Sequence, residues 1–216
     1  MEKLHLDILD FGRKAIFQKL AVFRPVGYLS GGTALALQLG HRVSYDFDIF
    51  CGKEVSAAFA ARVRKELPVR EVSVNNADEF TFFTDNEIKI SFIFYPFDLQ
   101  KYLLDFPDAP LRIISPLGTA LAKAYALNRR NAWRDYVDLY AILKKRITTI
   151  EEITREAAVV FGGLFNEKLF LAQLVYTEDI SATEISGTQL LESATLEEVR
   201  SFFEKEVDAY LKLKLA

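Results

Sequence analysis

Two carboxylates occupy alternate positions in a short segment where polar and apolar residues alternate. On an extended strand, Ser44, Asp46 and Asp48 would share one face, while Tyr45 and Phe47 would point into the core. The two aspartates would then lie about 7 Å apart at their α-carbons, from a rise of about 3.4 Å per residue. Ionised carboxylates this close repel each other unless a cation binds between them, and oxygen ligands suit Mg²⁺ or Mn²⁺. The spacing predicts a divalent metal site; a solvated strand end is the alternative.

A glycine pair, Gly31 and Gly32, opens a helical segment, and Asp46 follows Gly32 by 14 residues. The free N–H groups and the positive dipole end of a helix N-terminus can hold a phosphate, although a simple tight turn is the alternative interpretation. Metal-binding acids beside a phosphate-binding turn are the parts that phosphoryl and nucleotidyl transfer require, because cations neutralise a polyphosphate while the turn positions it. The two motifs together indicate that chemistry.

The elements that must position these residues follow from hydrophobic periodicity and from Gly and Pro signals. Strands are expected at residues 26–30, 45–51, 69–74, 79–84 and 87–95, the last three as a meander. Helices are expected at residues 6–23, 33–39 and 55–67, and then at 117–130, 133–145, 150–161, 166–176 and 196–213. The order predicts an α+β fold, with a small mixed β-sheet and flanking helices at residues 1–110 and a C-terminal helical region at residues 111–216.

Composition narrows the function classes. The chain has 216 residues, half of them hydrophobic, which is enough to bury a large core. One cysteine, Cys51, and two histidines are too few for an internal disulfide or a Cys/His zinc site. The apolar runs are far shorter than the roughly 18 to 20 residues of a membrane span. We therefore expect a cytoplasmic protein that does not bind a membrane.

The net charge of −3 conceals a local asymmetry. Residues 112–146 contain eight basic and two acidic side chains, whereas residues 151–200 contain three basic and ten acidic ones. A basic segment before an acidic one fits an anion-binding face beside a solvated helical tail, although solubility alone also explains charged helix faces. The asymmetry is compatible with a phosphate ligand.

Several motifs, in order, resemble the AbiEii/AbiGii-type nucleotidyltransferase-like proteins. The first is YLSGGTALAL at residues 28–37 followed by GHRVSYDFDIF at residues 40–50, and the second is SPLGTALAKA at residues 115–124. The third runs from Arg130 through WRDYVDLY at residues 133–140. The resemblance spans residues 26–143 and implies a nucleotidyltransferase fold of the DNA polymerase β type.

The resemblance also implies roles. Asp46 and Asp48 would be metal ligands for Mg²⁺ or Mn²⁺, Gly31 and Gly32 would lie near the triphosphate of an NTP substrate, and the helical half would close over the nucleotide. Characterised members act as toxins of toxin–antitoxin or phage-defence systems, and some transfer nucleotides to tRNA. A cognate antitoxin is therefore an expected partner.

The helical region supplies further candidates. On one helix, Lys123 and Arg130 would lie on a common stripe about 10.5 Å apart, at about 1.5 Å per residue, a span that suits a triphosphate. Asp135 and Asp138 would orient Lys123 or Arg130, although Arg134 and Asp138 could also form a purely structural pair. The proposed catalytic set is Asp46, Asp48, Lys123 and Asp135. The proposed phosphate-binding set is Gly31, Gly32, Thr33, Arg42, Ser44, Lys89, Arg130 and Arg134.

One departure from the family pattern concerns the third carboxylate, which nucleotidyltransferases place on a further strand. That position holds Ser91, and a serine cannot act as a carboxylate at neutral pH. Glu87 lies about 13 Å away along the strand, at about 3.3 Å per residue, which is too far without a register shift. A shifted alignment, a base such as Asp135, or a protein that binds nucleotide without transferring it are the open alternatives.

The leading hypothesis is a Mg²⁺-dependent enzyme that transfers NMP from an NTP to a nucleic-acid (tRNA-like) or protein hydroxyl, as the toxin of a toxin–antitoxin pair. The alternative is a non-catalytic nucleotide- or RNA-binding module on the same fold, which Ser91 favours. A third hypothesis is a protein–protein partner whose acidic tail docks a basic antitoxin.

Overall fold

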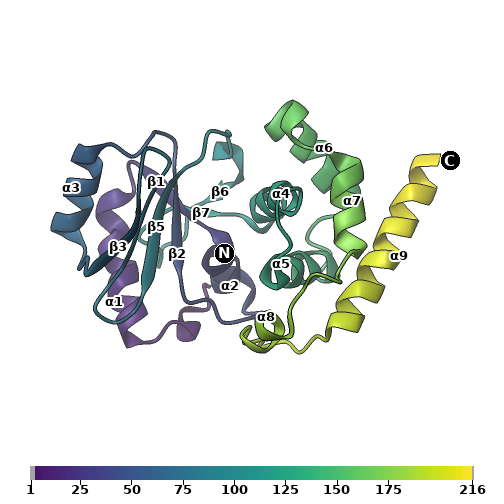
Figure 1. Cartoon of the computed structure of the whole chain (residues 1–216), viewed down its shortest axis with the longest axis horizontal. Helices are drawn as coiled ribbons and strands as arrows, with labels where there is room; N and C mark the ends of the chain where they lie inside the picture. Colours follow the sequence, from purple (N-terminus) through teal and green to yellow (C-terminus); the bar gives the residue numbers. More distant parts are fainter. Residues whose placement is uncertain (1–2, 216) are drawn as a thin grey trace. The chain divides into compact units, whose positions relative to one another are not determined.

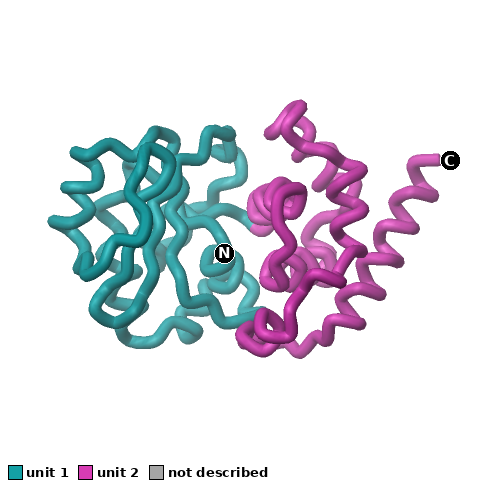
Figure 2. Tube along the Cα trace, in the orientation of Figure 1, with its two compact units in different colours: residues 1–115 teal, residues 116–216 magenta. Residues whose placement is uncertain are grey.

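The computed structural model describes residues 3–215 of the chain. Its contacts divide the chain into two compact units, Met1–Ser115 and Pro116–Ala216 (Figure 2). The division of function at residues 110 and 111 stays a prediction.

A mixed β-sheet forms the centre of the first unit (Figure 1). Within residues 3–215, its strands are β1 (Gly27–Ser30), β2 (Phe47–Cys51), β3 (Glu71–Asn75), β4 (Glu79–Phe83), β5 (Lys89–Phe94), β6 (Leu103–Leu104) and β7 (Ile113–Ile114). They are ordered β3-β4-β5-β2-β1-β7-β6. The β2–β5 and β1–β7 pairs are parallel and the others antiparallel, so β3, β4 and β5 form the predicted meander. The predicted α+β class is confirmed.

Aromatic packing covers one face of this sheet. Phe17 of α1 (Phe11–Lys19) stacks on Phe47, with ring centroids 6.0 Å apart. Phe23 of η2 (Leu20–Phe23) and Phe59 of α3 (Ala57–Glu66) both pack on Phe92, at 4.8 Å and 5.2 Å. Side chains alternate along a strand, so Asp48 and Ser91, the neighbours of Phe47 and Phe92, face the other way. The polar candidates therefore share the face opposite to this packing.

The prediction of one helix over residues 6–23 is wrong in its boundaries. The segment contains η1 (Leu6–Ile8), then α1, then η2, and Asp10 separates the first two. The Asp10 side chain accepts a hydrogen bond from the Arg13 backbone N–H at 2.8 Å, so it caps α1 and starts a new helix. Helical periodicity continues through this cap, which is why the pattern alone joins the two.

Within the residues that the structure describes, the second unit consists of helices and the loops that connect them. Its helices are α4 (Pro116–Leu127), α5 (Trp133–Lys144), α6 (Ile150–Phe161), η4 (Gly162–Leu164), α7 (Glu167–Val175), α8 (Ala182–Ser186) and α9 (Leu196–Leu215). The Tyr136 hydroxyl lies 2.7 Å from the backbone carbonyls of both Gln173 and Tyr176, which ties α5 to the end of α7. The sequence prediction missed α8, a five-residue helix closed by a capping box between Ser181 and Glu184.

Among residues 3–215, no single helix has the length and apolar content of a membrane span. The segments Ile150–Leu164 and Glu167–Val175 reach that length and composition only together, and a bend of 118° separates them.

Candidate active site

A row of polar side chains crosses four strands of the sheet. Ser30 of β1 lies opposite Asp48 of β2, and Asp48 lies opposite Ser91 of β5. Ser91 in turn lies opposite Thr81 of β4. Residues directly opposite each other in a sheet share a face, so these four side chains project from the same side. The register of the strands therefore places Asp48 between Ser30 and Ser91.

The glycine turn lies against Asp48. Gly31 begins α2 (Gly31–Leu39) with a φ of +69°, a conformation that favours glycine. A Cβ atom at Gly31 would lie 2.5 Å from Asp48 Oδ2, so no side chain fits between the turn and this carboxylate. Ser30, the N-cap residue, makes no side-chain hydrogen bond to the helix. The structure thus brings the predicted phosphate-binding turn and the predicted metal ligand into direct contact.

Asp46 precedes the strand instead of lying within it. The Thr33 hydroxyl donates to the Asp46 backbone carbonyl and lies 2.8 Å from Ser44 Oγ. Arg13 Nε donates to the Tyr45 carbonyl at 3.1 Å. Because side chains engage these carbonyls, β2 begins at Phe47, and the prediction that Tyr45 points into the core is wrong: it is 42% exposed. Thr33 therefore holds the Asp46 backbone, and Ser44 contacts the Thr33 hydroxyl.

Arg42 is a buried cation packed against the second glycine. Its side chain is 2% exposed, and Nη1 donates to the Val43 carbonyl at 3.1 Å. A Cβ atom at Gly32 would lie 2.0 Å from Arg42 Nη2, so glycine at this position leaves room for the guanidinium. The glycine pair is thus required twice, once beside a carboxylate and once beside a cation.

Glu87 does not supply a carboxylate beside Asp48. It precedes β5 with a φ of +57°, and its carboxylate accepts from Arg70 and is 67% exposed. Lys89, on the face of Ser91, begins β5. Sequence reasoning missed Thr81, whose hydroxyl donates to the Glu79 carboxylate. The available signal for Thr81 and Glu79 was the alternation of polar residues with phenylalanines along β4.

A second charged cluster lies in the helical unit. Lys123 Nζ of α4 lies 2.5 Å from Asp135 Oδ1 and 2.9 Å from Asp138 Oδ2, both on α5. Arg130 Nε contacts Asp135 Oδ2 at 3.0 Å. The two carboxylates are buried, with side chains 2% and 0% exposed. Arg134, by contrast, is exposed on α5. Asp135 and Asp138 thus orient Lys123.

The prediction that Lys123 and Arg130 lie on one helical stripe is wrong, because α4 ends at Leu127 and Arg130 follows it. Lys123 and Arg130 instead both form ion pairs with Asp135. Burial raises the pKa of this carboxyl, but the charges of Lys123 and Arg130 outweigh burial and lower the pKa below its usual range. Asp135 is therefore ionised at neutral pH.

Asp48 at the glycine turn and Asp46, two residues before it in the sequence, have the donor chemistry that suits a magnesium ion. Asp46 and Asp48 offer carboxylate oxygens, the ligands that Mg²⁺ and Mn²⁺ prefer. Within residues 3–215, no group of three His, Cys, Asp or Glu side chains is arranged to hold a metal. Mg²⁺ usually binds through one or two carboxylates and completes its coordination with water and substrate phosphates, so two aspartates suffice.

A family model described as nucleotidyl transferase AbiEii toxin, type IV TA system, matches residues 16–212. An uncharacterized protein of Aquifex aeolicus (strain VF5) is 29% identical over 188 residues, which are 86% of this chain and 88% of that protein.

Two solved structures share the fold. The nucleotidyltransferase toxin MenT4 from Mycobacterium tuberculosis has a TM-score of 0.64 at 16% identity, covering 91% of this chain and 80% of its own. An H. pylori protein described as a nucleotidyltransferase has a TM-score of 0.54 at 16% identity, covering 93% of each chain. With the family match spanning most of its length, the chain belongs to the AbiEii nucleotidyltransferase toxin family.

Proposed function

We propose that this protein transfers a nucleoside monophosphate from an NTP to the hydroxyl of an acceptor, a tRNA-like nucleic acid or a protein, in a Mg²⁺- or Mn²⁺-dependent reaction. The observation that carries the proposal is the contact between Asp48 and the glycine turn: a Cβ at Gly31 would lie 2.5 Å from the carboxylate. This contact puts the Asp48 carboxylate beside the N-terminus of α2, where backbone N–H groups favour phosphate.

Each candidate site residue of the first unit has a role in this proposal. Asp46 and Asp48 would hold the metal, which when bound neutralises phosphate charge and favours deprotonation of the attacking hydroxyl. Gly31 and Gly32 would offer backbone N–H groups to the phosphates. Thr33 and Ser44 would keep Asp46 in place through its backbone. Arg42 and Lys89 would supply positive charge to the triphosphate.

The cluster in the second unit holds the remaining residues of the proposal. The acceptor oxygen attacks the α-phosphorus and the bond from that phosphorus to the β-phosphate bridging oxygen breaks, which releases pyrophosphate. Asp135 would act as a positioning residue, because its buried carboxylate is already paired with Lys123 and Arg130 and its lowered pKa makes it a poor base at neutral pH. Lys123, whose ammonium contacts two carboxylates, would neutralise charge on the leaving group together with Arg130 and Arg134.

A second candidate function is nucleotide or RNA binding without transfer. The observation that favours it is the register of β2 and β5, in which Ser91 lies opposite Asp48. A carboxylate on that neighbouring strand would be close enough to share a metal with Asp48, and a serine hydroxyl is a far weaker ligand and base.

Transfer from radiolabelled NTPs into total RNA and total protein separates the two candidates. The wild type, Asp46→Asn and Asp48→Asn are compared with Asp85→Asn, an exposed acid between β4 and β5. Transfer by the wild type and Asp85→Asn that both site variants abolish supports the enzyme. Mg²⁺-dependent NTP binding without transfer by the wild type supports the binding module.

The toxin role has its own test. Induced expression of the wild type should arrest bacterial growth, and Asp48→Asn should not. Co-expression of the neighbouring gene product should restore growth if that product is the antitoxin. Growth arrest by Asp48→Asn at equal protein level would separate toxicity from the proposed reaction.

A further inference from the structure

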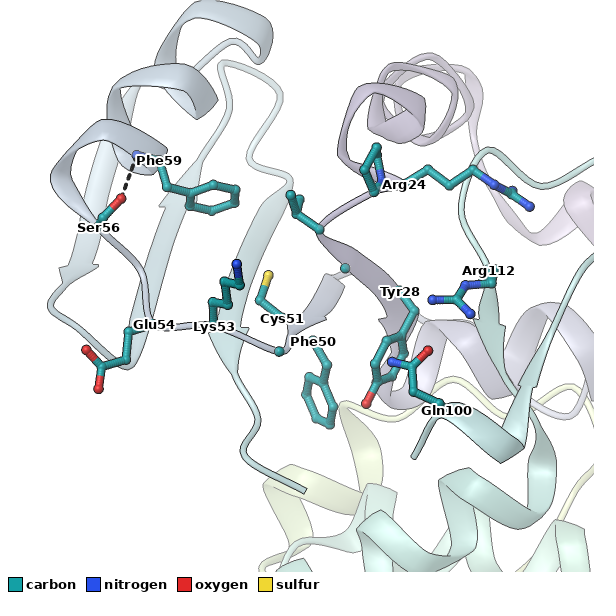
Figure 3. A pocket seen from close by; sticks show the side chains of 14 residues that line it. Arg24, Tyr28, Phe50, Cys51, Lys53, Glu54, Ser56, Phe59, Gln100 and Arg112 are labelled. Carbon is teal, nitrogen blue, oxygen red and sulfur yellow. Dashed lines mark hydrogen bonds between the residues drawn. The ribbon is translucent and has the colours of Figure 1, made fainter. Parts of the chain in front are cut away.

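A cavity of about 430 Å³ lies in the first unit, at the end of β1 and β2 away from the glycine turn (Figure 3). Its volume lies within the roughly 300 to 1,000 Å³ of small-molecule sites. The floor is formed by strand residues, since Tyr28 pairs with Phe50 and Gly27 pairs with Cys51. Asp48 lies opposite Ser30, two residues beyond the Tyr28–Phe50 pair, so the cavity and the acid pair are separate places on the sheet.

Positive charge faces this cavity without a counter-ion. Arg112 and Lys53 both line it, and within residues 3–215 neither side chain has a hydrogen bond or an ion pair. Arg24, also in the lining, pairs with Asp105. Figure 3 shows the Arg112 guanidinium directed toward Tyr28, and the Glu54 carboxylate turned away from both. The half-buried Arg112 guanidinium and the exposed Lys53 ammonium are therefore available to an anionic ligand.

The start of α3 adds to the positive potential. The Ser56 hydroxyl accepts from the Phe59 backbone N–H at 3.1 Å and caps this helix. Both residues line the cavity, so the positive end of the α3 dipole borders it. Two unpaired cations and a helix N-terminus on one cavity suit a phosphate group better than a carboxylate, because a phosphate accepts more hydrogen bonds.

The remaining wall is aromatic. The rings of Tyr28 and Phe50 lie edge to face with centroids 6.0 Å apart, and Phe59 projects from the opposite side (Figure 3). Burial raises the pKa of the Cys51 thiol to about 12, so this wall residue is neutral and not a nucleophile at neutral pH. Aromatic rings in a cavity that is also lined by cations are suited to stack a planar base that carries a phosphate.

We propose that this cavity binds a nucleotide, with its phosphate on Arg112 and Lys53 and its base against Tyr28 and Phe50. The nucleotide is either free or one unit of an RNA strand, since both present the same base and phosphate. The site is separate from the Asp46 and Asp48 pair and needs no metal.

Isothermal titration calorimetry in EDTA tests this with AMP, adenosine, inorganic phosphate and a six-residue oligoadenylate as probes. AMP should bind the wild type more tightly than adenosine or phosphate does. Arg112→Gln and Lys53→Gln should each weaken AMP binding about tenfold or more. The control Lys65→Gln, which removes an exposed charge from α3 outside the cavity, should leave it unchanged, and so should Asp48→Asn.

The relative affinities of the probes identify the ligand class. Tighter binding of the oligoadenylate than of AMP, with the same dependence on Arg112, assigns the site to a nucleotide within RNA; the reverse assigns it to a free nucleotide. Absence of AMP binding, equal binding of phosphate alone, or loss of binding in Asp48→Asn overturns the proposal.

Discussion

The two acidic pairs of the molecule are held by opposite means. In Met1–Ser115, Asp48 is placed by strand register and by a glycine that has no side chain to displace it. In Pro116–Ala216, Asp135 and Asp138 are buried around the ammonium of Lys123. The first arrangement depends on volume and backbone conformation, and the second depends on charge. The two regions should therefore fail in response to different substitutions.

The largest effect should follow from removal of the central cation. Lys123→Met leaves Asp138 buried without its ammonium partner, which should cost about 3 to 5 kcal/mol in the free energy of unfolding. Urea denaturation of the wild type and the variant measures this difference. Lys145→Met is the matched control, because Lys145 pairs with Glu192 at the surface and should change stability by less than about 1 kcal/mol. Equal losses of stability in the two variants would show that the Lys123 cluster depends on charge no more than a surface ion pair does.

A smaller effect should come from one methyl group at the glycine turn. Gly31→Ala forces a side chain into a φ of +69° and against the Asp48 carboxylate, which should cost about 1 to 3 kcal/mol and reduce nucleotide transfer. Thermal unfolding and the transfer assay measure the two effects. Gly163→Ala is the control, because a Cβ at that position has nothing within 4 Å. A fully active and stable Gly31→Ala protein would show that the turn accommodates a side chain beside Asp48.

The stability that the ion pairs of Asp135 contribute should also decrease at acidic pH. The folded-state pKa of Asp135 is lowered, so its contribution to stability is fully present above the unfolded value, 3.8, and is lost as pH falls through the folded value. Wild-type stability should therefore fall more steeply below about pH 4 than that of Asp135→Asn. Denaturation midpoints at pH 3 to 6 test this, and parallel curves for the two proteins would argue against an ionised Asp135.

The smallest effect should be at Glu87. Its carboxylate pairs with Arg70 near the edge strand and does not approach Asp48. Glu87→Gln should therefore leave nucleotide transfer at the wild-type rate in the assay with labelled NTPs. A loss of transfer comparable with that of Asp48→Asn would mean that Glu87 acts as the third carboxylate after all.

Much of this arrangement could be predicted from local sequence patterns. The strand, glycine pair and helix around Gly31 form a contiguous signal, and the meander follows from alternation. The start of β2 could not be predicted, since it depends on Arg13 and Thr33 capturing two carbonyls from distant parts of the chain. The convergence of Lys123 and Arg130 on Asp135 likewise depends on α4 ending at Leu127, where no proline or glycine marks the boundary.

We propose that Asp46 and Asp48 together hold a divalent cation beside the glycine turn. Electron paramagnetic resonance of Mn²⁺ with the full-length protein tests it directly, through the amount of free ion that remains. The wild type should bind Mn²⁺, more tightly when an NTP is present, and Asp46→Asn and Asp48→Asn should each lose most of that binding while keeping the wild-type circular dichroism spectrum. Unchanged Mn²⁺ binding in both variants would contradict the assignment of the metal site.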